Sequence, residues 1–193
     1  EKLYVCVLSA TFANSWYNLS TYLSNNTISF IETSDNSYKV ITLDEGSYNI
    51  IELMAEIKSK LESNSTNSLT YTLTYNEITN SVTITHSDTA NIVVNFNFTN
   101  STSCRRMLGF LSSIKTIDNS NTSISSDRSV DITDTYNSIY IRLPNLSNQK
   151  VVESSTGRFS NIVAHIPVPT SRNTIFTYEP SKPFCMELNQ TVI

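Results

Sequence analysis

The 193-residue sequence is poor in the residues that build disulfide frameworks, metal centres and phosphate-binding loops, with three cysteines, two histidines and three glycines. Cys6, Cys104 and Cys185 are an odd set at wide spacing without a Cys-x-x-Cys pair, so they indicate a reducing compartment more than a disulfide scaffold. Cys6 stands in an apolar run, which predicts a buried small hydrophobic residue. Gly46 and Gly109 are isolated from other glycines, which excludes a glycine-rich phosphate loop.

The sequence also lacks an excess of positive charge and any long apolar run. Thirteen Lys and Arg stand against seventeen Asp and Glu, for a formal net charge of −4. This balance gives no reason to expect binding to nucleic-acid phosphates, and the only adjacent basic pair is Arg105-Arg106. No apolar run approaches the ~20 residues of a membrane-spanning helix. We therefore expect neither a nucleic-acid partner nor a membrane span.

The composition that is present suits one folded domain. Hydrophobic residues make up 39% of the chain and charged residues 16%, as in a globular fold with a core. No internal repeat or linker divides the chain, so we expect a single domain over residues 1–193. Because the chain opens at Glu1 without a methionine and stops at Ile193 in a strand-like run, we expect a fragment of a longer protein.

One stretch has the hydrophobic period of a helix. Asn49 can cap its first turn and Glu52 can complete a capping box, so the pattern predicts an amphipathic helix over residues 49–62. Four apolar residues recur at helical spacing along one face: Ile50, Met54, Ile57 and Leu61.

The rest of the chain has the period of short strands. Alternating apolar residues predict a three-stranded meander over residues 69–98, which we expect to form one sub-unit with the helix. The polar stretch 112–134 is expected to be a long loop, alone or with one short edge strand. Further strands are expected at 2–9, 27–32, 38–43, 138–143, 161–168, 172–178 and 184–193. With no alternation of helix and strand, the pattern predicts an all-β antiparallel sandwich with one inserted helix.

The residues that could carry chemistry are scattered. His86 and His165 lie on separate expected strands without a nucleophile signature nearby, and His86 falls on an apolar face, which predicts a core or boundary histidine. Asp127, Asp131 and Asp134 could converge on a calcium ion. Their spacing matches no calcium loop, so a solvated acidic loop is the favoured interpretation.

Two further groups were weighed as sites. Asp44 and Glu45 form a possible carboxylate pair, but acids just before a helix are stabilising on their own. Trp16, Tyr17 and Tyr22 could stack on a sugar, although packing of their loop onto the core is favoured. The sequence therefore gives no catalytic, cofactor-binding or metal-ligating residue, and we expect no cofactor and no enzymatic activity.

Several segments, taken in order, resemble the penton-type and minor capsid proteins of large double-stranded-DNA viruses, virophages and Polinton-like elements. The segments are 4–10 (YVCVLSA), 14–18 (NSWYN), 25–30 (NNTISF), 46–48 (GSY), 108–110 (LGF), 139–141 (IYI) and 160–163 (SNIV). The resemblance implies a jelly-roll-like antiparallel β-sandwich that assembles into a capsid shell, often as a pentamer at a fivefold vertex.

On this resemblance we expect a structural capsid protein of the virion, made in the host cytoplasm or nucleus. Its expected partners are further copies of itself, in a homopentamer, together with the major capsid protein and other shell proteins. The polar loops 112–134 and 145–160 are candidates for these contacts. The alternative is a glycan- or receptor-binding β-sandwich, such as a viral fibre head or a lectin-like module. A hydrolase is a third class, which loss of an activity in His165→Ala would support.

Overall fold

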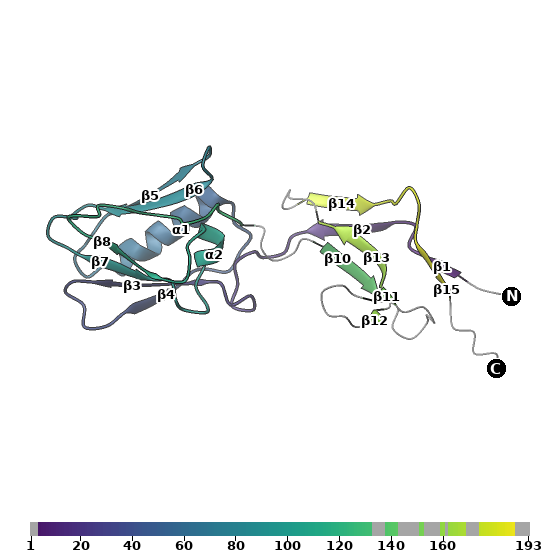
Figure 1. Ribbon diagram of the computed structural model, residues 1–193, viewed down its shortest axis with the longest axis horizontal. Helices are drawn as coiled ribbons and strands as arrows, with labels where there is room; N and C mark the ends of the chain where they lie inside the picture. Colours follow the sequence, from purple (N-terminus) through teal and green to yellow (C-terminus); the bar gives the residue numbers. More distant parts are fainter. Residues whose placement is uncertain are drawn as a thin grey trace. The chain divides into compact units, whose positions relative to one another are not determined.

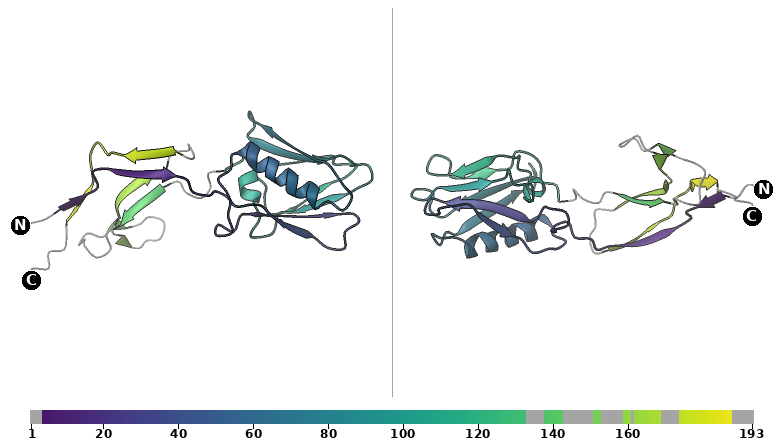
Figure 2. Two further views of the ribbon diagram at one scale, coloured as in Figure 1. Left: turned by 180° about the vertical axis from the view of Figure 1, so that it is seen from behind. Right: turned by 90° about the horizontal axis from the view of Figure 1, so that it is seen from below.

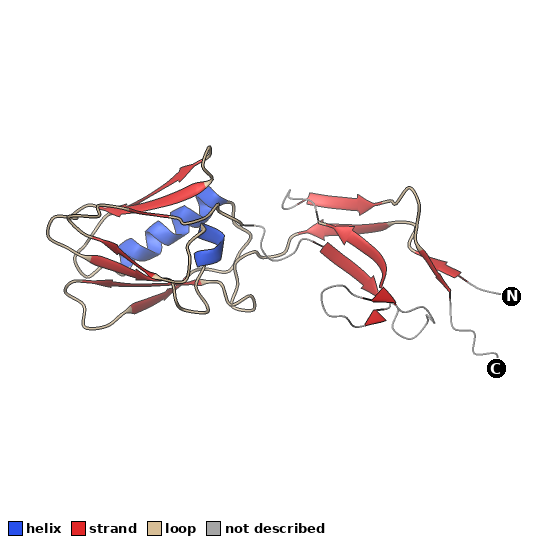
Figure 3. Ribbon diagram, viewed as in Figure 1, coloured by secondary structure: helices blue, strands red, loops and turns tan. Residues whose placement is uncertain are grey.

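The computed structural model describes residues 4–132, 138–142, 151–152, 159–160, 162–168 and 174–187. The chain divides into two compact units, which we describe separately. The central unit is Trp16–Thr135, and the terminal unit combines Glu1–Ser15 with Tyr136–Ile193. Figure 1 labels the elements along the chain, and Figure 3 shows both described helices within the central unit. A single domain over residues 1–193 stays a prediction.

The central unit is built from two antiparallel sheets and a helix. The first sheet has the order β4-β3-β7-β8, with β3 at Thr27–Glu32, β4 at Lys39–Thr42, β7 at Val94–Asn97 and β8 at Ile114–Ile117. The second has the order β5-β6-β9, with β5 at Tyr71–Asn76, β6 at Ser81–His86 and β9 at Ile124–Ser125. Helix α1 (Ile50–Ser63) runs beside β5 and covers one open side of the two sheets (Figure 2).

Helix α1 has the N-cap residue that the sequence predicts, Asn49. The Asn49 side chain accepts a hydrogen bond from the backbone N of Glu52 at 2.8 Å, and the Glu52 carboxylate accepts one from the backbone N of Asn49 at 2.7 Å. This reciprocal pair satisfies two donors that a helix start otherwise leaves free. The face toward the sheets is buried at Leu53, Met54, Ile57 and Leu61. The predicted amphipathic helix is therefore confirmed, one residue further along the chain, although Ile50 is only partly buried and Leu53 is buried in addition.

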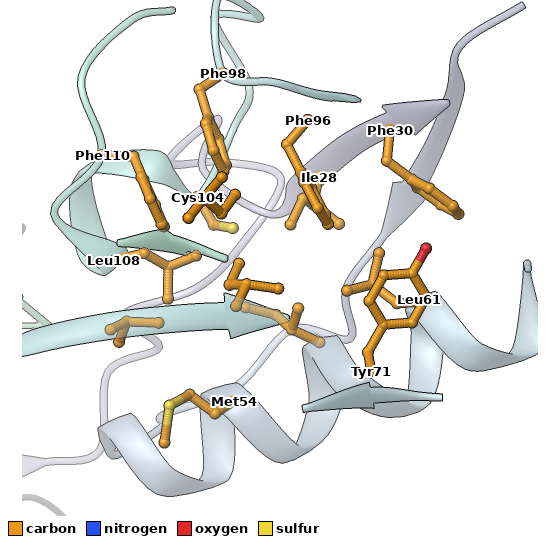
Figure 4. Close-up of a cluster of buried hydrophobic side chains, with 14 of the residues drawn as sticks. Ile28, Phe30, Met54, Leu61, Tyr71, Phe96, Phe98, Cys104, Leu108 and Phe110 are labelled. Carbon is orange, nitrogen blue, oxygen red and sulfur yellow. The ribbon is translucent and has the colours of Figure 1, made fainter. Parts of the chain in front are cut away.

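The core of the central unit is a single cluster of buried apolar side chains from both sheets and both helices. Figure 4 shows its aromatic row, in which Phe96 lies 6.3 Å from Phe30 and 6.1 Å from Phe98, between ring centroids. Phe98 in turn stacks on Phe110 at 4.4 Å. Tyr71 approaches Phe96 edge-on from the opposite sheet at 6.3 Å. Aromatic contacts thus join the two sheets across the interior.

The expected meander over residues 69–98 is wrong in its third strand. Strands β5 and β6 form the predicted hairpin, but β7 pairs with β3 and β8 in the other sheet. The alternation correctly places Val94 and Phe96 on a buried face. A two-residue period fixes which face of a strand is buried, but it does not choose the strand's hydrogen-bonded neighbour. Here β7 faces β5 across the core instead of lying beside its hairpin.

The polar stretch 112–134 is not a free loop. It contributes β8 and β9, and Ile117 and Ile124 from these strands belong to the core. Just before it, the short helix α2 (Arg105–Leu108) places Met107 and Leu108 in the same core. None of the helices in the described parts of the chain is long and apolar enough to cross a membrane.

The terminal unit consists of antiparallel pairs of strands. Strand β1 (Tyr4–Cys6) pairs with β15 (Cys185–Glu187), β2 (Ala10–Asn14) with β14 (Thr174–Tyr178), β10 (Ser138–Arg142) with β13 (Ile162–Pro167), and β11 (Val151–Val152) with β12 (Phe159–Ser160). The strand expected over residues 2–9, around the apolar run of Cys6, is not buried in a larger sheet. Instead it belongs to a two-stranded pair, and Tyr4 and Leu8 are exposed.

The cysteine prediction is also wrong. Cys6 and Cys185 lie opposite each other in the β1–β15 register and form a disulfide, with Cα atoms 4.4 Å apart. Cys6 is therefore not a buried hydrophobic residue, and the sequence separation of 179 residues explains why spacing gave no hint of the bond. Disulfides persist in oxidising environments, so this bond is at odds with the reducing compartment expected from the cysteine count. Cys104 is the free cysteine, buried in the central core.

The all-β prediction is confirmed by this arrangement. The described residues form mostly antiparallel strands in sandwich-like layers, with one amphipathic helix inserted between β4 and β5.

Candidate functional site

The two histidines lie in different units and do not share a site. His86 on β6 is 6% exposed, its ring lies 6.1 Å from Tyr71, and neither ring nitrogen has a hydrogen-bond partner. Burial lowers the pKa of His86, and the nearby charges of Asp88 and Glu32 oppose that shift only in part. His86 is thus the core or boundary histidine that its apolar strand face predicted.

His165 on β13 is exposed and stacks on Tyr140, with ring centroids 4.9 Å apart. Its Nε2 lies 2.7 Å from the Ser138 Oγ, a distance that suits a serine nucleophile and its base. Such a pair needs a third group to hold the imidazole in orientation. Among the described residues, no carboxylate is hydrogen-bonded to His165, so the contact reads as a cross-strand hydrogen bond between β10 and β13.

Of the carboxylates that were considered for a metal, that of Asp127 accepts hydrogen bonds from the protein itself. Asp127 accepts from Lys115 Nζ at 2.5 Å and from the backbone N of Leu111 at 3.0 Å. The Leu111 hydrogen bond and the Lys115 charge hold the pKa of Asp127 below its usual range. Asp134 lies outside the described residues, and within them no cluster of three or more His, Cys, Asp or Glu side chains could hold a metal ion.

Asp44 and Glu45 turn toward different partners. The Asp44 carboxylate accepts from Lys60 Nζ at 2.9 Å, and the Glu45 carboxylate accepts from the backbone N of Thr21 at 2.8 Å. The Thr21 hydrogen bond lowers the pKa of Glu45. Each carboxylate therefore fastens a neighbouring segment, and the two do not converge on a common point.

Sequence reasoning missed a buried carboxylate, Glu32, at the end of β3. It is 1% exposed and accepts hydrogen bonds from the backbone N and side chain of Asn67, at 2.9 and 2.7 Å, and from the Tyr71 hydroxyl at 3.2 Å. Burial raises the pKa of Glu32, but hydrogen bonds from Ser65, Asn67 and Tyr71 outweigh it, and the pKa lies below its usual value. An alternating strand pattern ending in Thr33 and Ser34 gave no signal of this. The fully satisfied carboxylate ties β3 to the segment after α1.

Trp16, Tyr17 and Tyr22 were expected to pack onto the core. The structure does not confirm this for the two tyrosines. Tyr22 is 88% exposed and Tyr17 53% exposed, whereas Leu19 is fully buried in their place. Asn18 fixes the loop by donating to the carbonyls of Tyr48 and Ile132, at 2.8 and 3.0 Å. The loop is therefore held in place with its two tyrosines toward solvent.

A charged recess of the central unit lies where α2 meets the segment after β9. It has a volume of about 450 Å³ and is lined by Arg105, Arg106, Gly109, Phe110, Leu111, Arg128, Ser129 and Asp131. We call it the arginine pocket. Sequence reasoning noted the Arg105-Arg106 pair but missed Arg128, which only the fold brings to the same place.

Gly109 builds the wall of the arginine pocket. Its φ of +80° ends α2, and its carbonyl accepts from the backbone N atoms of Asp127 and Arg128 at 3.0 and 2.9 Å. A Cβ atom at this position would lie 2.2 Å from the Arg128 carbonyl oxygen. A third hydrogen bond runs from the backbone N of Asp131 to the Met107 carbonyl at 3.2 Å. Arg128 is thus fixed beside α2 by its backbone.

Comparison with known proteins identifies the fold. No family model matches the chain, and no curated protein matches it. A solved structure does match it, the crystal structure of a selenomethionine-labelled mavirus penton protein, with a TM-score of 0.54 and 11% sequence identity. The match covers 98% of this chain and 73% of the penton chain. At this identity the likeness is one of fold, so the chain has a penton-like, jelly-roll-like β fold.

Proposed function

We propose that the chain is a structural subunit of a viral capsid, of the penton-type vertex or minor capsid class, without enzymatic activity. The observation that carries the proposal is the fold match to a virophage penton protein over 98% of the chain. In this role the chain would reside in the virion, assemble with copies of itself, as a pentamer at a vertex, and contact the major capsid protein and other shell proteins.

Exposed apolar side chains of the terminal unit support a role in assembly. Leu8 is 72% exposed, Ile175 75% and Phe184 54%, all on or beside its two-stranded pairs. Water-exposed apolar residues and open strand edges favour contact with another chain. We therefore expect the terminal unit to supply contacts between subunits, as candidates beside the earlier loops 112–134 and 145–160, the second of which lies mostly outside the described residues.

The native mass of the purified chain tests the proposal. Light scattering at several concentrations and two salt levels is expected to give a closed oligomer, with a fivefold mass for a vertex subunit. Leu8→Asp with Ile175→Asp should reduce that mass. Ile78→Asp is the matched control, because Ile78 is 96% exposed in the β5–β6 turn of the central unit. A trimer would favour a fibre head instead, and a mass unaffected by the double variant would contradict the proposed surface.

A glycan-binding module is the second candidate, favoured by the exposed Tyr17 and Tyr22 on their anchored loop. Exposed aromatic faces on a fixed loop suit sugar stacking. A glycan array should then give hits that are lost in Tyr22→Ala. An array without hits, together with stable self-association, would favour the capsid role.

A further inference from the structure

The lysines and arginines of the central unit differ in how their charges are used. Between residues 16 and 135 the chain has four lysines and three arginines. Each lysine lies within 3.8 Å of a carboxylate oxygen, in the pairs Lys39–Asp35, Lys58–Glu62, Lys60–Asp44 and Lys115–Asp127. No such ion pair joins Arg105, Arg106 or Arg128 to any residue that the structure describes. All three arginines instead line the arginine pocket.

The arginine pocket keeps an excess of positive charge. Among the described residues its lining holds three arginines and one acidic residue, Asp131. The next carboxylate along the chain, Asp127, already accepts hydrogen bonds from Lys115 and from the backbone of Leu111. Because the backbone around Gly109 fixes Arg128 against α2, the three arginines lie at one recess. The charge of Arg128 helps to lower the pKa of Asp127, but the described residues still leave an excess of positive charge at this recess.

We propose that the arginine pocket binds the carboxylate groups of an acidic peptide segment from a neighbouring polypeptide. A guanidinium presents two parallel donors that match a carboxylate, and it retains its charge at any physiological pH. The recess of about 450 Å³ has the size of a small-ligand site, enough for one or two side chains. Phe110 and Leu111 in the lining give the methylene groups of a glutamate an apolar wall.

The same charges argue against a nucleic acid as the occupant. A phosphate backbone needs a track of free cations, and the four lysines of the central unit are already paired. Asp131 would repel a second phosphate at the pocket, and the chain as a whole carries a formal charge of −4. A peptide with separated carboxylates meets neither obstacle, because its backbone is neutral.

Peptide binding by the full chain is the first measurement. The probe is a fluorescent, amidated hexapeptide carrying two glutamates, followed by anisotropy, and its counterpart carries glutamines instead. Arg106→Gln and Arg128→Gln are each expected to weaken binding at least tenfold. Lys58→Gln, which removes the same charge from α1, should leave it unchanged. Since neither guanidinium has an ion-pair partner among the described residues, both variants should keep the wild-type melting temperature.

Three results would overturn the proposal. The first is that the glutamate and glutamine peptides bind equally well. The second is that the wild type and the arginine variants bind the peptide equally well. The third is that a single-stranded decathymidylate binds more tightly than the peptide and does so through Arg106. Competition by millimolar inorganic phosphate is expected, because phosphate presents the same oxyanion chemistry to the guanidinium groups. Failure of phosphate to compete would count against the pocket as the binding site.

This inference rests on the proposed function only for the source of the peptide. Native mass separates two sources: a smaller mass in Arg106→Gln assigns the acidic segment to a second copy of this chain, and an unchanged mass with lost peptide binding assigns it to another protein. A wild-type chain that stays monomeric yet binds the peptide would contradict the capsid role alone. An assembled wild-type chain without peptide binding would contradict the pocket alone.

Discussion

The two units of this chain are stabilised in different ways. The central unit buries 22 apolar residues in one cluster, whereas the described part of the terminal unit buries three, at Val163, Ala164 and Ile166. The terminal unit has instead a disulfide between β1 and β15 and a set of exposed apolar side chains. A large core makes a unit stable on its own, and a small one leaves stability to cross-links and to partners. The comparison indicates that the central unit is the self-sufficient part.

Truncation of the central core should have the largest effect. Phe96→Ala removes a fully buried ring that contacts Phe30, Phe98 and Tyr71, and is expected to destabilise the central unit by about 3–5 kcal/mol. Ile175→Ala in the terminal unit, where the side chain is 75% exposed, is the control and should cost less than about 0.5 kcal/mol. Chemical denaturation followed by tyrosine and tryptophan fluorescence measures both. Equal losses of stability in the two variants would contradict the view that the two units are stabilised in different ways.

Loss of the disulfide should destabilise the terminal unit and spare the central unit, which is the reverse of the effect of Phe96→Ala. Cys6→Ser is expected to destabilise the terminal unit by about 2–4 kcal/mol and to leave the central transition unchanged. Cys104→Ser is the control. Because Cys104 is buried in the central core, this variant should destabilise the central unit and leave the terminal unit unchanged. Hydrogen exchange resolved along the sequence measures both. Faster exchange in α1 than in β2 after Cys6→Ser would contradict the assignment.

Acidification should act on the central unit. The pKa of His86 is lowered in the folded chain, so the unfolded chain takes up this proton at a higher pH than the folded chain does. Stability is expected to fall as the pH drops below about 6.5, by at most about 1.4 kcal/mol per pH unit, until the folded pKa is passed. Urea unfolding at pH 7.5, 6.5 and 5.5 measures this slope. His86→Leu should remove it, and His165→Gln should not.

The smallest expected effect is local to α1. Asn49→Ala removes the side-chain acceptor of the capping box and is expected to cost about 1 kcal/mol. Asn67→Ala would be a harsher test of the same unit, since it withdraws a donor from the buried Glu32. Thermal melting followed by circular dichroism separates the two. A cost for Asn49→Ala as large as that for Phe96→Ala would mean that α1, and not the core, controls this unit.

The predictions that succeeded depend on neighbours in sequence. Two such features are the capping box of Asn49 and Glu52 and the β5–β6 hairpin. Each forms between residues close together in the chain, so the sequence pattern alone predicts it. The partner of β7 was predicted wrongly, because the same apolar period suits either sheet. Pairing in a sandwich is decided by long-range packing, which periodicity does not encode.

The features that escaped prediction join distant parts of the chain. Cys6 and Cys185 are 179 residues apart, and an odd number of cysteines pointed away from a bond. Arg128 reaches the Arg105-Arg106 pair only because the Gly109 carbonyl holds its backbone. Nothing in the sequence near Glu32 indicates a buried carboxylate, because its partners Asn67 and Tyr71 lie 35 and 39 residues away in the chain. In each case a chemical property arises from a contact that no local pattern reports.

The disulfide also determines how the chain would carry a mechanical load. Force applied to residues before Cys6 and after Cys185 passes through the two sulfur atoms, because the bond bridges the 179-residue separation between them. The polypeptide between them, including the whole central unit, lies outside this path and bears no tension. A single proteolytic cut between the two cysteines would likewise leave both pieces covalently attached. After reduction of the disulfide, the same force would pass through the central unit and could unfold its core.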